Sequence, residues 1–210
     1  MLKHLFAVPF YKAKINSERY NKQELIEVIA NNYNLNPSRN QWDNESDLHH
    51  AYNDVNNDKF NQPDYSKLIP LYQEHVQKFL DAFFDVNIQY NFYIVNYTCF
   101  GKKQHMEMHN HPNTCFSGIH YVKFKKGEHR PTKYYNGADW SSFSSAWFPK
   151  PMSDALISSG LKHSWYHQTF TLDVEEEDLV IMPSCVRHSV PTSNSNELRM
   201  AVVFHIDITG

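Results

Sequence analysis

Three histidines in this chain are spaced so that their side chains can bind one metal ion. His109 and His111 stand two residues apart in the segment His-Asn-His-Pro, and His188 lies far downstream. On an extended chain, residues two apart point to the same face and lie roughly 7 Å apart. Both imidazoles can lean toward one metal, because metal–nitrogen bonds are about 2 Å long. With a third ligand from another strand, the metal is held on one face and open on the other.

The ligand types and a nearby arginine indicate the metal and its partner. Nitrogen ligands that leave one face of the metal open suit non-haem Fe(II) and oxygen chemistry. Arg199 follows His188 by eleven residues, and a planar guanidinium binds a carboxylate through two parallel hydrogen bonds. Ala201 is expected on the same strand face as Arg199 and leaves space beside it. We therefore expect an iron site next to an arginine that binds an acid.

The second half of the chain reads as short β-strands that would position these side chains. Segments rich in β-branched and aromatic residues alternate with turns, which predicts a closed or sandwiched antiparallel sheet. Gly118 within a strand indicates that another group approaches the backbone closely. We expect strands at residues 92–98, 104–109, 116–125, 166–174, 178–182, 186–190 and 198–208.

One predicted turn has a particular role in assembling the site. Residues 191–197 are rich in serine and asparagine, which favour turns. We expect this turn to fold the strand of Arg199 back beside the strand of His188. Both side chains would then reach one cavity.

The first ninety residues have a different pattern. Helical spacing of apolar residues predicts a helix at 21–33 and a clearer one at 66–84, with Ser66 as its cap. The stretch 34–63 is rich in asparagine and aspartate and is expected to form loops. We expect the second helix to cover one face of the sheet.

Composition narrows the classes of partner and the compartment. The 210 residues carry a formal charge of −3, which gives no electrostatic reason to expect binding to nucleic acid or an anionic membrane. No stretch approaches the roughly 20 apolar residues of a membrane span. Cys99, Cys115 and Cys185 have spacings that fit no zinc module, and they read as reduced and mostly buried. We therefore expect a cytoplasmic protein.

The order of these motifs resembles that of the 2-oxoglutarate/Fe(II)-dependent oxygenases. The resemblance rests on the His-Asn-His-Pro segment, the Ser-Gly-Ile-His-Tyr-Val segment at 117–122, the distal His188 and Arg199. The chain is most similar to prolyl-hydroxylase-like oxygenases of phage or bacterial type with a His-x-His-Pro motif. A phage-encoded member would act in the host cytoplasm.

The resemblance spans residues 91–208 and implies a fold. That fold is mainly β with flanking helices, a double-stranded β-helix of the jelly-roll or cupin-like kind, with iron at the mouth of the barrel. Residues 91–210 would form this barrel, and residues 1–90 would be a helical and loop segment packed on it. The two parts would form one compact unit.

The resemblance also assigns roles to individual residues. His109 matches the first iron ligand and His188 the distal one. Arg199 matches the residue that binds the far carboxylate of 2-oxoglutarate, and Tyr121 falls where related hydroxylases place a tyrosine against that carboxylate. Ser189 is a further candidate for orienting a carboxylate, with an ordinary strand serine as the alternative.

His111 is the position at which the chain departs from the family. It stands where the family usually has an aspartate or glutamate, and a neutral imidazole offsets none of the charge of Fe(II). Three histidines are one possible ligand set. Glu107 or His105, on the strand face of His109, can instead supply a ligand, with His111 orienting a neighbour through a hydrogen bond. A chain that binds no metal is the remaining alternative.

The implied activity is oxidation by Fe(II), 2-oxoglutarate and O2, which yields succinate and carbon dioxide and hydroxylates an aliphatic C–H bond. The substrate would be a peptide or protein side chain or a small molecule. One alternative is a cupin-type three-histidine metalloenzyme that uses no 2-oxoglutarate. Another is a barrel that only binds.

Several other residues have weaker assignments. The long loop at 127–164 is expected to be a lid, a binding wall or partly disordered. His120 is expected to pack in the core, and His205 to lie inside the barrel. The acidic run from Glu175 to Asp178 is expected to be a solvated turn. His163 and His167 are candidates for lining the substrate entrance. Trp140, Trp147 and Trp165 are expected either to grip an apolar or planar surface or to close a hydrophobic core.

Overall fold

The computed structural model describes residues 8–40, 43–52, 62–137 and 169–209, and these form two sheets and two α-helices. A larger sheet contains β1 (Tyr11–Lys14), β2 (His49–Tyr52), β3 (Tyr90–Phe100), β5 (Phe116–Lys123), β8 (Asp178–Pro183) and β10 (Arg199–Ile208). A smaller sheet contains β4 (Met106–His109), β6 (Lys133–Tyr135), β7 (Thr169–Thr171) and β9 (His188–Val190). The helices are the short 3-10 helix η1 (Ser17–Arg19), α1 (Lys22–Leu35) and α2 (Leu68–Phe83).

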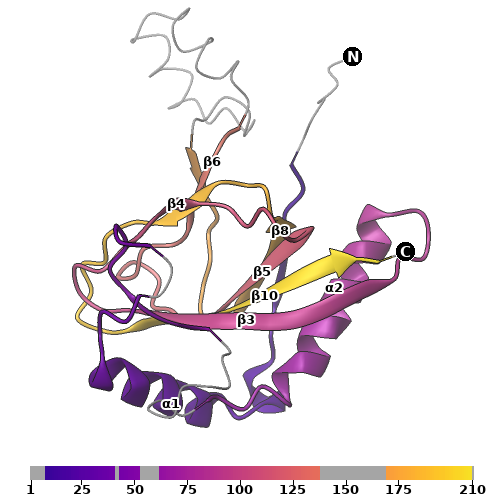
Figure 1. Cartoon of the computed structure of the whole chain (residues 1–210). Helices are drawn as coiled ribbons and strands as arrows, with labels where there is room; N and C mark the ends of the chain where they lie inside the picture. The colour runs from indigo at the N-terminus through magenta and orange to yellow at the C-terminus, as the bar shows by residue number, and fades with distance from the viewer. Residues whose placement is uncertain (1–7, 41–42, 53–61, 138–168, 210) are drawn as a thin grey trace, which may run out of the picture.

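Both sheets are antiparallel throughout. The strand order is β1-β8-β5-β10-β3-β2 in the larger sheet and β4-β9-β6-β7 in the smaller one. Figure 1 shows the smaller sheet above the larger one, with α1 below the larger sheet and α2 at its right-hand side. The predicted architecture, mainly β with flanking helices, is therefore confirmed.

The predicted strands are present, most of them with shifted ends, and three further strands were missed. The missed strands are β1, β2 and β6, of three or four residues each. They are short, and β2 and β6 fall in segments whose composition predicts loops. Their hydrogen bonds come from distant partners: β1 pairs with β8 and β2 pairs with β3. Residues 166–168 of one predicted strand lie outside the described residues.

The prediction that the strand of Arg199 lies beside the strand of His188 is wrong. β10 forms its ladders with β3 and β5 in the larger sheet, whereas His188 begins β9 in the smaller sheet. The turn at 191–197 thus carries the chain from one sheet to the other. Both side chains still line one cavity, which they enter from opposite sheets.

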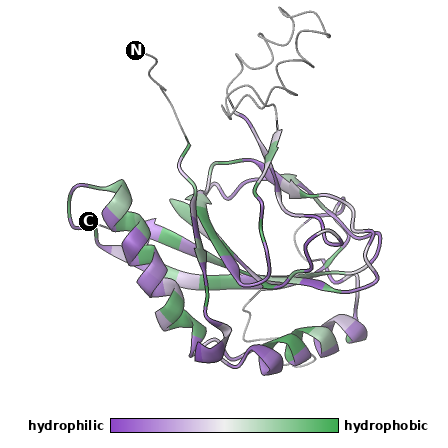
Figure 2. Ribbon diagram, turned by 180° about the vertical axis from the view of Figure 1, so that it is seen from behind, coloured by the Kyte–Doolittle hydropathy of each residue, from purple (hydrophilic) through white to green (hydrophobic). Residues whose placement is uncertain are grey.

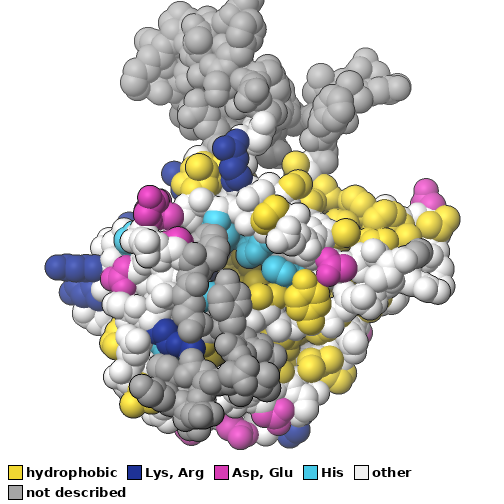
Figure 3. All heavy atoms as spheres, in the orientation of Figure 1, with side chains coloured by type: hydrophobic (Ala, Val, Ile, Leu, Met, Phe, Trp, Pro, Cys, Tyr) yellow, Lys and Arg dark blue, Asp and Glu magenta, His cyan; other side chains and the backbone are white. Residues whose placement is uncertain are grey.

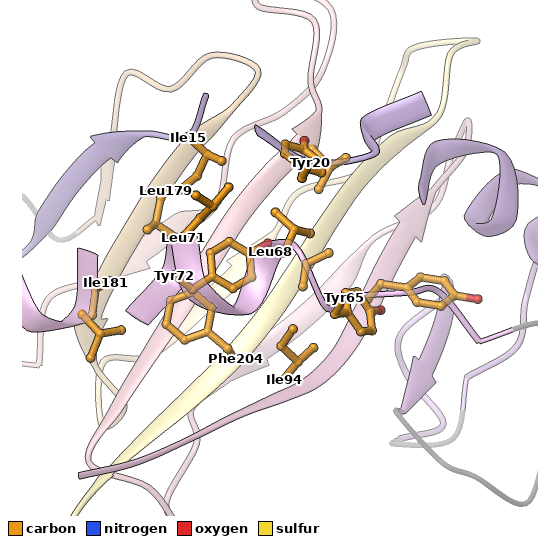
Figure 4. Close-up of a cluster of buried hydrophobic side chains, with 14 of the residues drawn as sticks. Ile15, Tyr20, Tyr65, Leu68, Leu71, Tyr72, Ile94, Leu179, Ile181 and Phe204 are labelled. Carbon is orange, nitrogen blue, oxygen red and sulfur yellow. The ribbon is translucent and has the colours of Figure 1, made fainter. Parts of the chain in front are cut away.

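α2 packs on the outer face of the larger sheet. Its buried residues recur at helical spacing, so one side of the helix is apolar. Tyr72 stacks on Phe204 of β10, with ring centroids 4.9 Å apart, and both belong to the cluster in Figure 4. Figure 2 shows the same contrast between the apolar and polar sides of the helices. The prediction that this helix covers one face of the sheet is confirmed.

The ends of α2 differ from the prediction. Ser66 does not cap the helix, because its backbone nitrogen donates to Asp64 Oδ1 and the cap residue is Lys67. Ala82 and Phe83, near the end of the predicted helix, are exposed. The last turn of the helix therefore extends past the edge of the core.

The acidic run from Glu175 to Asp178 contains the predicted turn but is only partly solvated, because Glu175 is exposed whereas Glu177 and Asp178 are buried. The Glu177 carboxylate is buried and accepts a hydrogen bond from Tyr20 Oη at 2.9 Å. It also lies 2.7 Å from Lys22 Nζ and 3.3 Å from the buried His120. These partners come from distant segments, so the local sequence gives no sign of them. The packing role predicted for His120 is confirmed.

The cysteines and the helices bear on the expected compartment. Cys99 is buried, whereas Cys115 and Cys185 are exposed, contrary to the prediction for those two. All three cysteines are free. Within the described ranges, neither helix has the length and apolar character that crossing a bilayer requires.

Gly118 provides a test of the core. A Cβ atom there would lie 2.0 Å from the ring of Phe204, which confirms the close approach predicted from the sequence. We expect Gly118→Ala to lower the free energy of unfolding by about 1–3 kcal/mol, because the core must shift to accept the methyl group. Urea denaturation measures this change.

Gly137 supplies the control, since a Cβ there would meet nothing within 4 Å. Gly137→Ala should leave stability almost unchanged. Phe204→Leu should recover part of the loss in a double variant with Gly118→Ala. Equal stability of the two alanine variants would contradict the packing described.

Candidate functional site

A cavity of about 220 Å³ lies between the two sheets. The larger sheet supplies one wall, because alternate residues of a strand point to the same face. The smaller sheet supplies the opposite wall through β4 and β9. The β10 residues that line the cavity are Arg199, Ala201, Val203 and His205.

Three histidines converge on this cavity. His109 ends β4 and lies opposite His188 of β9 in the strand register. His111 lies just before the turn that follows β4, and its backbone nitrogen donates to Ser184 O at 2.9 Å. Ring nitrogens of the three residues lie within 4.8 Å of one another, the only such group of three in the described part of the chain. Figure 3 shows histidine side chains gathered on this face.

Two of the histidines have their ring protons fixed by the backbone. His109 Nδ1 lies 2.9 Å from Glu107 O, and His188 Nδ1 lies 2.8 Å from Val186 O. A carbonyl oxygen only accepts hydrogen bonds, so Nδ1 carries the proton in each neutral ring. Nε2 then keeps a free lone pair, which is the form of imidazole that binds a metal.

Burial keeps these rings neutral. Loss of water, followed by the charges of neighbouring histidines, lowers the pKa of His111 to about 2. The same two causes lower the pKa of His188 to about 3. Burial also lowers the pKa of His109. At neutral pH the cluster therefore presents uncharged imidazoles, and no proton has to leave before they bind a cation.

Arg199 is a buried cation without an acidic partner. Its side chain is 2% exposed and lies between the rings of Phe100 and Tyr121, at 5.1 and 5.2 Å from their centroids. Nη2 donates to Thr132 Oγ1 at 3.3 Å, while the buried Nε has no partner. No carboxylate in the described ranges forms a salt bridge with it. Burial of an unpaired charge is costly, so this position fits a bound anion.

Tyr121 lies behind Arg199, outside the cavity lining. Its hydroxyl donates to Thr132 Oγ1 at 2.9 Å, so Thr132 connects both side chains. Sequence reasoning missed Thr132, which falls in the segment predicted to be a loop. Asn96 on β3 was also missed; it lies on the same strand face as Thr98, which lines the cavity too. Asn96 lines the cavity, and its Oδ1 is buried with no partner.

Two candidates lie away from the cavity. The Ser189 hydroxyl is 3.1 Å from the hydroxyl of Tyr135, on the opposite side of β9 from His188. The Glu107 carboxylate is exposed and lies 3.4 Å from His105 Nε2. The structure thus brings together His109, His111, His188 and Arg199, without Ser189 or Glu107. The candidates Trp140, Trp147, His163, Trp165 and His167 lie outside the described residues.

Comparison with known proteins identifies the family. The family model described as "Putative 2OG-Fe(II) oxygenase" matches residues 97–205, which is more than half of the chain. The chain therefore belongs to this family of enzymes, and Fe(II) and 2-oxoglutarate are its cofactor and cosubstrate. No curated protein matches the chain in a sequence search.

Solved structures confirm the fold. A Pseudomonas putida prolyl-4-hydroxylase is similar with a TM-score of 0.54 and 8% identity, over 96% of this chain and 93% of the other. A collagen prolyl hydroxylase of Paramecium bursaria Chlorella virus-1 in a 2-oxoglutarate complex has a TM-score of 0.53 and 10% identity, over 96% of this chain and 96% of the other. A Trichoplax adhaerens prolyl hydroxylase with a hypoxia-inducible-factor peptide has a TM-score of 0.53 and 11% identity, over 94% of this chain and 83% of the other. The predicted double-stranded β-helix is therefore confirmed.

The low pKa of His188 makes the stability of the metal-free protein depend on pH. An unfolded histidine takes up a proton near pH 6.5, whereas folded His188 does so only near pH 3. The unfolded chain thus binds more protons between these values, and stability falls as pH decreases. This one group contributes about 1.4 kcal/mol per pH unit in that range.

We expect His188→Gln to reduce the slope of unfolding free energy against pH by about this amount between pH 6 and pH 4.5. Urea denaturation of chelator-treated protein at several pH values measures the slope. The same slope in wild type and variant would show that His188 titrates normally in the folded protein.

Proposed function

We propose that His109, His111 and His188 bind Fe(II) through Nε2 and that Arg199 binds the distal carboxylate of 2-oxoglutarate. The observation that carries this proposal is one cavity containing both a cluster of neutral imidazoles and a buried guanidinium without an acid. The histidines supply lone pairs for the metal, and the arginine supplies a positive charge that one end of a dicarboxylate can bind. The donor set therefore fits both groups.

Three histidines bind the metal without offsetting its charge. The family's usual carboxylate would leave one net positive charge at the site, whereas neutral imidazoles leave two. A more positive site attracts the oxo-acid end of 2-oxoglutarate more strongly. We propose that His111 is a ligand in its own right, because its ring nitrogen lies with those of His109 and His188. Glu107, whose carboxylate is at the surface, is not a ligand in this proposal.

The chain's own residues orient the cosubstrate. Arg199 is held in place by two aromatic rings and by Thr132, so its planar donors are fixed before the carboxylate arrives. Tyr121 acts on the same carboxylate indirectly, through Thr132 and through its ring against Arg199. Ala201, on the same strand face, leaves space for the carbon chain of 2-oxoglutarate.

Bound Fe(II) supplies the redox chemistry that couples decarboxylation of 2-oxoglutarate to oxidation of the substrate. We propose hydroxylation of an aliphatic C–H bond, in which O2 provides one oxygen atom to the product alcohol and one to succinate. Carbon dioxide is released. The two sheets line the cavity on opposite sides and so shield the histidines in part from bulk water.

We propose a peptide or protein side chain as the substrate. The similar structures include a collagen prolyl hydroxylase and a prolyl hydroxylase with a bound peptide fragment. Arg199 is the only Arg, Lys, Asp or Glu side chain lining the described cavity. Once the cosubstrate neutralises it, the cavity suits an uncharged group. Because all three cysteines are free, we further propose a reducing compartment, the cytoplasm.

Binding of Fe(II) and 2-oxoglutarate without oxygen tests the proposal. A chelated 2-oxo acid gives a weak visible charge-transfer band, which we expect for the wild type. The Arg199→Ala variant should bind iron normally, but its affinity for 2-oxoglutarate should fall by roughly a hundredfold, because two charge-assisted hydrogen bonds are lost. His188→Ala should lose iron. The exposed Arg130 provides a control, since Arg130→Ala should match the wild type.

The identity of the second ligand is tested separately. We expect His111→Gln to weaken Fe(II) binding by a hundredfold or more, and Glu107→Gln to leave it unchanged. The Glu107 substitution spares the backbone carbonyl that fixes His109. Anaerobic titration calorimetry measures both affinities. The reverse order of effects would make Glu107 the ligand and remove His111 from the set.

A further inference from the structure

His205 lies directly behind His111 and is not part of the three-histidine group. It is half-buried on β10 and lines the cavity. Its Nε2 lies 3.2 Å from His111 Nδ1, and the two rings meet edge to face with centroids 4.8 Å apart. The ring of His111 also lies 5.2 Å from the ring of His109, edge to face, and 5.2 Å from the ring of His188, on which it stacks.

This contact takes the place of a backbone hydrogen bond. His109 and His188 each donate Nδ1–H to the carbonyl two residues earlier. His111 lies just before the turn that follows β4, and among the described residues its one side-chain hydrogen bond is the contact with His205. The proton arrangement of His111 therefore depends on a side chain from the other sheet.

One proton is shared between the two facing nitrogens, and its position decides whether His111 can be a ligand. If His111 Nδ1 carries the proton, Nε2 has a free lone pair toward the other two histidines. If His205 Nε2 carries it, neutral His111 holds its own proton on Nε2 and has no lone pair there. Only the first arrangement gives three equivalent Nε2 donors.

We propose that His205 is a positioning residue that accepts a hydrogen bond from His111 Nδ1 and thereby directs His111 Nε2 to the metal. This inference rests on the proposed function and deepens it. Hydrogen bonds from the outer nitrogen of a ligating histidine fix the orientation of its ring. In this chain the acceptor is a neutral imidazole, so His111 keeps its Nδ1 proton and binds the metal as an uncharged ligand.

The arrangement connects the two ends of the cosubstrate site through one strand. β10 begins with Arg199 and carries His205 six residues later, on the same face. Arg199 would bind the far carboxylate, while His205 would hold His111, the ligand that stands where the family usually has a carboxylate. A change in the register of β10 would therefore disturb both binding partners together.

The test compares two substitutions of His205 by their affinity for Co(II), measured by calorimetry on the metal-free protein. His205→Ala removes the acceptor, and we expect roughly 10- to 100-fold weaker binding. His205→Gln places an amide oxygen near the position of Nε2, so affinity should stay within about threefold of wild type. His75→Gln is the control, because His75 is half-buried on α2 and bonded to Tyr11, far from the cavity.

Nitrogen-15 NMR of the metal-free wild type gives a second readout that needs no variant. We expect His111 to carry its proton on Nδ1. The proposal is overturned if that proton is on Nε2, if His205→Ala binds Co(II) like wild type, or if His205→Gln is as weak as His205→Ala. Failure of the wild type to bind any metal would instead contradict the proposed function.

Discussion

The burial of Arg199 without a carboxylate is the constraint on which the rest of the site depends. A guanidinium that is 2% exposed needs an anion, and the described chain supplies only Thr132 and two aromatic rings. The protein therefore keeps a cation in its interior for a ligand that comes from solution. The sheets hold this cation and the three imidazoles in one cavity, which matches a dicarboxylate that binds iron at one end and arginine at the other.

The two sheets contribute different parts of this arrangement. The smaller sheet and its turns carry the three histidines, whereas the larger sheet carries Arg199 and His205 on β10. Neither sheet alone forms the site. The helices on the outer face and the buried Glu177 network stabilise the larger sheet, and so they fix the position of β10 relative to the histidines.

The sequence predicted the parts of the fold and site that depend on local pattern. The spacing of His109 and His111, the strand glycine at 118 and the apolar side of α2 can all be read within a short window. The sequence did not predict features set by distant pairing. The strands β1 and β2, the partners of Glu177 and the place of Arg199 in the opposite sheet all depend on contacts far along the chain.

The most direct measurement is an anaerobic crystal structure with Fe(II) and 2-oxoglutarate, using anomalous scattering at the iron edge. The account predicts one iron peak bound by Nε2 of His109, His111 and His188. It also predicts a carboxylate of 2-oxoglutarate within hydrogen-bond distance of Arg199. Iron bound through Glu107, or a carboxylate bound away from Arg199, would contradict it.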